Sequence, residues 1–120
     1  MSLEGLEISE ENMEKLKNIA IEITNCFSQL VLLTKPITDK HLEDHEGKWP
    51  ISEQYLKVHE ETSEAYKGYN RNLVEWKEEH FDMMFAQLTL FHLHKFSRDV
   101  MFEEIFNCVK KFYKRGWLVL

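Results

Sequence analysis

The chain has 120 residues, of which 43% are hydrophobic and 30% are charged, and this balance argues against a disordered or collagen-like protein. Only 4 glycines and 2 prolines are present, too few for the many tight turns of an all-β protein. The formal net charge of -6 argues against a protein that coats duplex DNA, because such binding depends on many contacts between cations and phosphates. The length fits a single domain spanning residues 1–120.

Cysteine usage and hydropathy predict a soluble protein of the cytoplasm. The two cysteines are too few for a disulfide framework or a four-cysteine zinc site. The longest apolar run, Leu30 to Leu33, is far shorter than the roughly 20 residues of a membrane helix. The acidic N-terminal segment does not have the form of a signal peptide. We therefore expect a cytoplasmic location and no contact with a membrane.

Apolar residues recur in steps of three and four, which is the period of a helix facing a core. This spacing predicts helices over residues 10–33, 52–68 and 73–96. A fourth helix is expected between an N-cap at Asp99 and the helix-ending Gly116. The sequence thus predicts an all-α, four-helix bundle-like domain.

Two details of this arrangement can be tested against the structure. Ser9 is a suitable N-cap for the first helix, and the proline-bracketed segment 34–50 is expected to be one long connection. The helix over 73–96 is the most apolar, so we expect it to be central. Its expected inward residues are Phe81, Met84, Phe85, Leu88 and Phe91.

Acidic residues cluster on the second and third predicted helices, in the order Glu60, Glu61 and Glu64, then Glu79 and Asp82. Acids three residues apart share a helix face, and like charges at this spacing cost about 0.2–0.5 kcal/mol per pair. Glu61 also lies on the expected inward stripe of its helix. If the two helices are antiparallel neighbours, a divalent cation would remove the repulsion, and an all-oxygen site suits Mg²⁺ or Mn²⁺.

Two other readings of the acidic cluster stay open. Lys57 can reach Glu61 one helical turn away, so the acids can also be a solvated face of a non-catalytic helical interaction module. A carboxylate-bridged iron bundle is disfavoured, because neither acidic cluster has a histidine three residues after a glutamate.

The motif Glu60-Glu61-x-x-Glu64, followed after 14 residues by Glu79-x-x-Asp82, resembles the EExxE…ExxD signature of the MazG-like, all-α nucleoside triphosphate pyrophosphohydrolases. The resemblance covers about residues 49–117. It implies hydrolysis of a nucleoside triphosphate between the α and β phosphates, with Mg²⁺ as cofactor. By the same resemblance Glu61, Glu64, Glu79 and Asp82 would bind the metal. Glu60 would be the catalytic base or a residue that supports the metal ligands. Members are usually homodimers or homotetramers.

The end of the chain also resembles this family. The basic segment 114–117 is similar to the stretch that often ends the last helix of its members, and this implies that Lys111 and Arg115 contact the phosphates. The family's usual lysine and asparagine positions hold Cys108 and Phe112 here, so an inactive, diverged member remains an alternative. Cations in a last helical turn also stabilise the helix dipole, which is a purely structural reason for both basic residues.

Trp49 is the candidate for contact with the nucleobase. It lies in the segment between the first two predicted helices, where its ring could stack on a base or close the end of the bundle. The sequence does not indicate which base or sugar is preferred.

Overall fold

The computed structural model describes residues 7–72 and 74–120, and all regular secondary structure in these residues is helical. The helices are α1 (Glu10–Leu32), α2 (Lys35–Asp44), α3 (Ile51–Asn70), α4 (Trp76–His94) and α5 (Arg98–Lys114). The predicted all-α class is therefore confirmed. Among these helices, none is both long enough and apolar enough to cross a membrane.

The chain forms two compact units. One consists of the described part of Met1–Gln29 together with Phe96–Leu120, and the other consists of Leu30–Lys95. The first unit contains most of α1 and all of α5. The second contains α2, α3, α4 and the last residues of α1.

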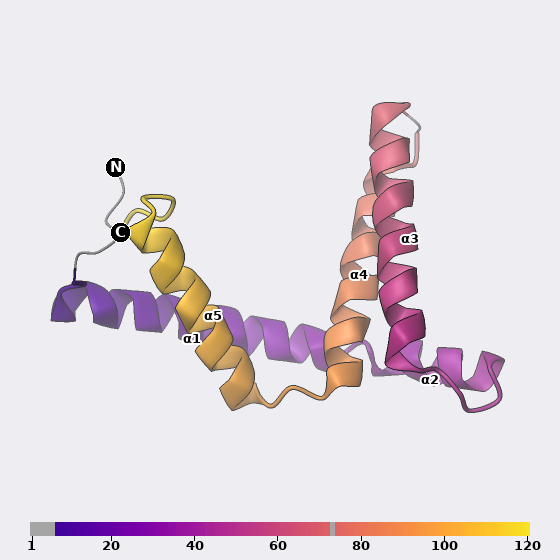
Figure 1. Ribbon diagram of the computed structural model, residues 1–120, viewed down its shortest axis with the longest axis horizontal. Coiled ribbons are helices and arrows are strands. Elements are labelled where there is room, and N and C mark those ends of the chain that lie inside the picture. The colour runs from indigo at the N-terminus through magenta and orange to yellow at the C-terminus, as the bar shows by residue number, and fades with distance from the viewer. Residues whose placement is uncertain (1–6, 73) are drawn as a thin grey trace. The chain divides into compact units, whose positions relative to one another are not determined.

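The core of the first unit lies where α5 packs on α1 (Figure 1). Leu16 and Ala20 of α1 are fully buried and pack with Val109 of α5. Partly buried apolar side chains surround them, namely Ile8, Ile19, Phe102, Ile105, Phe106, Tyr113 and Leu118. This apolar contact between segments far apart in sequence holds the unit together.

In the second unit, α3 and α4 lie side by side as an antiparallel hairpin (Figure 1). Small side chains permit the close approach: Ala65 of α3 and Ala86 of α4 are both buried. Gly68 is also buried, and a Cβ atom added there would lie 3.4 Å from Cα of Trp76. A side chain larger than alanine at position 68 would therefore push the two helices apart. The shorter helix α2 contacts α4.

The helix starts confirm one predicted cap and correct another. The Ser9 hydroxyl accepts a hydrogen bond from the backbone N–H of Asn12 at 3.2 Å, as expected of an N-cap. Helix α5 begins earlier than the sequence predicts, because the Ser97 hydroxyl accepts from the N–H of Val100 at 3.2 Å. Asp99 lies in the first turn, where its charge still favours the helix dipole.

The expectation of one long connection over residues 34–50 is wrong, since α2 occupies most of this segment. Pro36 does not prevent a helix, because it lies in the first turn, where no backbone N–H has a partner within the helix. An ion pair of 2.8 Å between Lys35 and Asp39 adds a contact one turn along α2.

Helix α4 buries only part of the face that the sequence predicts. Leu88 is buried and Phe91 is half-buried as expected, but Phe81, Met84 and Phe85 are exposed. The other buried residues of α4 are Ala86, Thr89 and Leu90. The helical period is predicted correctly, but the buried residues of α4 include the small side chains of Ala86 and Thr89, whereas Phe81 and Phe85 remain exposed. Leu73, at which the sequence places the start of this helix, lies outside the described residues.

Candidate functional site

Three carboxylates meet across the hairpin of the second unit. Glu61 of α3 and Glu79 and Asp82 of α4 each offer an oxygen atom, and these atoms all lie within 4.8 Å of one another. The spacing of three residues places Glu79 and Asp82 on one face of α4, and the antiparallel packing brings Glu61 opposite them. We call these residues the carboxylate triad. Three hard oxygen donors at this separation can bind a single divalent ion such as Mg²⁺ or Mn²⁺.

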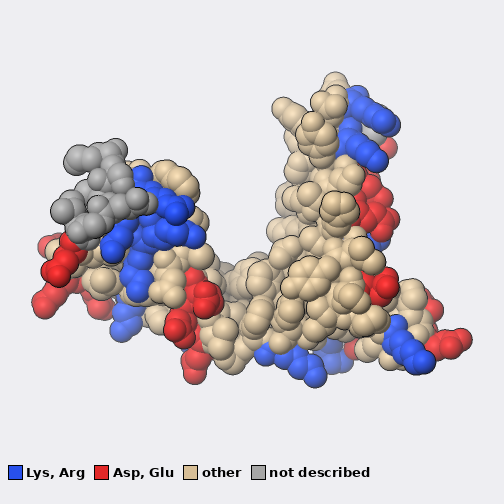
Figure 2. Space-filling model, viewed as in Figure 1, with Lys and Arg blue, Asp and Glu red and all other residues tan. Residues whose placement is uncertain are grey.

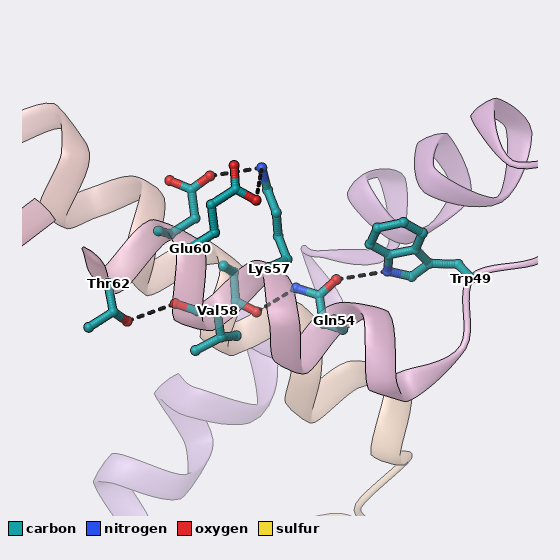
Figure 3. A network of polar contacts seen from close by, with 8 residues as sticks. Trp49, Gln54, Lys57, Val58, Glu60 and Thr62 are labelled. Carbon is teal, nitrogen blue, oxygen red and sulfur yellow. Dashed lines mark hydrogen bonds and ion pairs between the residues drawn. The ribbon is translucent and has the colours of Figure 1, made fainter. Parts of the chain in front are cut away.

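Glu61 is the buried member of the triad, with an exposed fraction of only 8%. A buried carboxylate needs a compensating charge, and here the Lys57 ammonium lies 2.9 Å from the Glu61 carboxylate. The hydrogen bond to Glu61 raises the pKa of Lys57 above its usual value. Lys57 also lies 4.0 Å from Glu60. Figure 3 marks the ion pairs of Lys57 by dashed lines. This lysine is therefore the cation that compensates Glu61 within the protein itself.

The remaining acids of the sequence motif lie at the edge of the triad. Glu64 is exposed, and its pKa is raised above the usual range, chiefly by the negative charge of Glu61 and also by that of Glu79. Its carboxylate therefore interacts electrostatically with the triad. Glu64 is not one of the residues whose oxygen atoms lie within 4.8 Å of one another. Glu60 is exposed and is oriented towards Lys57. The structure thus brings together three of the four predicted metal ligands and places the fourth beside them.

A cavity of about 160 Å³ adjoins the triad. Its walls come from α2, α3 and α4, and they consist of Ile37, His41, Gln54, Lys57, Glu61, Asp82, Phe85, Ala86 and Thr89. Among these lining residues Lys57 is the only lysine or arginine. The cavity therefore combines two carboxylates, one ammonium group and an apolar wall.

A chain of contacts connects Trp49 to this cavity. The Trp49 ring stacks on His41 with ring centres 4.1 Å apart. Its indole N–H donates to the Gln54 side chain at 2.8 Å, and Figure 3 shows this hydrogen bond. The Gln54 amide in turn donates to the backbone carbonyl of Ala86 at 2.8 Å. Burial, and then the charge of Lys57, lower the pKa of His41.

Gln54 is the residue of this chain of contacts that the sequence analysis did not single out. Gln54 precedes Glu61 by seven residues and so lies on the same face of α3, which is the one signal that could have indicated it. Nothing in the sequence indicates the stacking of His41 on Trp49, because it depends on how α2 folds back towards α3.

Lys111 lies in the last turn of α5 and Arg115 caps the C-terminus of this helix, in the first unit. With Asn107, Lys110 and Lys114 they line a surface depression of about 300 Å³. Figure 2 shows basic side chains gathered over this end of α5. The Arg115 guanidinium also lies 5.1 Å from the ring centre of Trp117. The predicted contact between these cations and a phosphate chain remains a prediction.

No protein-family model, curated protein or solved structure matches this chain. The functional argument therefore depends on the residues and on their geometry.

Proposed function

We propose that this protein is a Mg²⁺-dependent hydrolase that cleaves a nucleoside triphosphate between the α and β phosphates. The observation that carries the proposal is the carboxylate triad, in which Glu61, Glu79 and Asp82 offer oxygens within 4.8 Å beside a cavity. The resemblance of the acidic motif to the MazG-like pyrophosphohydrolases supports the reaction type. The all-oxygen composition of the triad supports Mg²⁺ or Mn²⁺ over a softer metal.

In the proposed reaction, residues of the second unit would bind the metal ion and accept a proton. The triad, joined by Glu64 at its edge, would hold the ion, which when bound supplies positive charge for the phosphates and acidifies water. Glu60 would accept the proton of the attacking water as general base. The water oxygen would bond to the α phosphorus while the bond to the oxygen bridging α and β breaks. The products are a nucleoside monophosphate and pyrophosphate.

Other residues would bind the remainder of the substrate. Trp49, held by its stack on His41 and its hydrogen bond to Gln54, would contact the nucleobase. By the resemblance of the chain's end to the same family, Lys111 and Arg115, which line a basic depression of the first unit, would contact phosphate.

We further propose that the protein acts as a homodimer or homotetramer, through the α3–α4 hairpin. Tyr55, Tyr66 and Tyr69 lie on one face of α3, and each is more than half exposed. On α4, Phe81 is 61% exposed. Several exposed aromatic side chains on one helical hairpin are typical of an interface. Light scattering coupled to size exclusion tests this: a monomer at 50–100 μM (about the range of a weak dimer) would contradict it.

One observation favours a second candidate, a non-catalytic helical interaction module. Lys57 already compensates the buried charge of Glu61, so the triad does not require a metal for folding. In this case the exposed aromatic face of the hairpin would be the functional surface.

Pyrophosphate release from a panel of NTPs and dNTPs distinguishes the two candidates. The proposal expects equal amounts of nucleoside monophosphate and pyrophosphate from at least one substrate, only with Mg²⁺ or Mn²⁺ present. The matched control is Asp39→Asn, which removes an exposed α2 carboxylate outside the lining of the cavity. Release of inorganic phosphate instead, or no turnover of any member of the panel, would contradict the proposed reaction.

A further inference from the structure

Lys57 contacts both the triad and the cavity beside it, a position that the acidic motif does not imply. Its ammonium lies 2.9 Å from Glu61, and Glu61 offers one of the three triad oxygens. The same lysine lines the cavity beside the triad. It therefore touches both the group that would hold a cation and the space that would hold an anion.

Two cations near one buried carboxylate repel each other. Glu61 has little contact with water, so solvent would screen this repulsion weakly. A divalent ion bound by the triad would therefore weaken the ion pair between Glu61 and Lys57. Rotation about the side-chain bonds of Lys57 can carry its ammonium into the cavity without a change in the backbone.

The charges that line the cavity favour the Lys57 ammonium inside it once the ion pair with Glu61 is broken. Lys57 is the only lysine or arginine in the lining, whereas Glu61 and Asp82 contribute negative charge. A polyphosphate that enters would be repelled by these carboxylates unless a cation faces it. Lys57 would be 35% exposed before this movement, so the loss of hydration on pairing with a phosphate is modest.

We infer that Lys57 is an exchangeable internal cation, which occupies Glu61 when no divalent ion is bound and transfers to the phosphate chain of the substrate when the ion binds. The inference rests on the proposed function, because it requires a metal at the triad. It adds a phosphate-binding residue on α3, the helix that also provides Glu61. It also makes the lysine a competitor of the metal in the absence of substrate.

The test is a pair of calorimetric titrations on the full chain and on Lys57→Met, which keeps the aliphatic stem and removes the charge. In the first titration Mn²⁺ alone is added, and the variant is expected to bind it at least tenfold more tightly. In the second, inorganic triphosphate is added as its magnesium complex in the presence of excess Mg²⁺. The variant is expected to bind this anion at least tenfold more weakly.

Two further variants separate this role from a general effect of charge. Lys40→Met removes a lysine that pairs with Asp44 at 3.0 Å on α2, outside the cavity, and it should change neither affinity by more than about twofold. Lys57→Arg keeps the charge and should restore triphosphate binding to near the wild-type affinity. If Lys57→Met does not fold by circular dichroism, Lys57→Gln serves for the same titrations.

The outcomes overturn different claims. If the wild-type protein binds Mn²⁺ and the uncharged variant binds it equally well, Lys57 does not compete with the metal and the inference is wrong. If the metal binds more tightly but triphosphate affinity is unchanged, the transfer to phosphate is wrong. If the wild-type protein binds no Mn²⁺, the proposed function fails and this inference fails with it.

Discussion

The side-chain amide of Gln54 donates a hydrogen bond of 2.8 Å to the backbone carbonyl of Ala86, and this contact ties α3 to α4 beside the carboxylate triad. Gln54 is 1% exposed, and its carbonyl oxygen accepts from the indole N–H of Trp49. One buried side chain thus connects the segment after α2 to both helices of the hairpin. The position of Trp49 next to the cavity depends on it.

Replacing Gln54 by leucine keeps its approximate size but removes both hydrogen bonds. The Trp49 N–H then loses its partner, so we expect the free energy of unfolding to fall by about 1–3 kcal/mol. Urea denaturation followed by circular dichroism measures this change. Gln87→Leu, at an exposed position of α4, is the matched control and should cost less than about 0.5 kcal/mol. Equal effects of the two substitutions would show that the buried amide does not stabilise the fold.

The substitutions Glu61→Gln and Asp82→Asn should each abolish metal-dependent hydrolysis, because each removes a charge that the ion requires. Their effects on the metal-free protein should differ. Asp82→Asn relieves repulsion between carboxylates and should raise the melting temperature slightly, whereas Glu61→Gln also breaks the ion pair with Lys57. Steady-state kinetics and thermal melting measure both effects. Wild-type turnover by either variant would remove that residue from the metal site.

The lowered pKa of His41 predicts a loss of stability in acid. Burial and the positive charges of Lys57 and His45 disfavour its protonated form, and Asp44 opposes them only weakly. Because the unfolded state accepts the proton more readily, this contribution is fully present above pH about 6.5 and is lost as the pH falls through 6.5 towards the folded pKa.

Proton NMR titration of the histidine ring should give His41 an apparent pKa below 6.5, and Lys57→Met should shift it upwards. Between pH 7 and pH 5.5, roughly the titration range of histidine, the wild-type protein should lose more stability than His41→Gln. A His41 pKa at or above 6.5 would contradict the half-buried, stacked position of this ring.

Lys111→Ala and Arg115→Ala separate phosphate binding from stabilisation of the end of α5. If both residues contact the substrate, each substitution should weaken triphosphate binding or turnover at least tenfold, or about 1.4 kcal/mol. The melting temperature should fall only slightly, since both side chains are exposed. The reverse pattern, with kinetics unchanged and a lower melting temperature, would assign both residues to the helix end.

The positions of the helices could be predicted from the sequence more readily than the faces that they bury. The period of the apolar residues located α1, α3, α4 and α5 to within a few residues. It did not reveal that α4 packs through Ala86 and Thr89 while Phe81 is exposed, because large apolar residues are expected inside only when a partner covers them. Helix α2 was missed because prolines were read as helix breakers, although Pro36 lies in a first turn.

The acidic site was predictable because it depends on spacing within helices and on one antiparallel contact. Glu79 and Asp82 share a face through their separation of three residues, and the hairpin brings Glu61 opposite them. The stack of His41 on Trp49 could not be predicted, because it depends on a contact between α2 and the segment that follows it.

The most direct test of the account is a titration of the metal-free protein with Mn²⁺, followed by calorimetry and by the electron paramagnetic resonance signal of the free ion. The account predicts saturable binding at the triad, a rise in melting temperature on filling, and loss of both in Glu79→Gln. Glu75→Gln, an exposed acid just before α4, should bind like the wild-type protein. Absence of saturable binding at millimolar Mn²⁺, or equal binding by Glu79→Gln, would contradict the assignment of a metal to this triad.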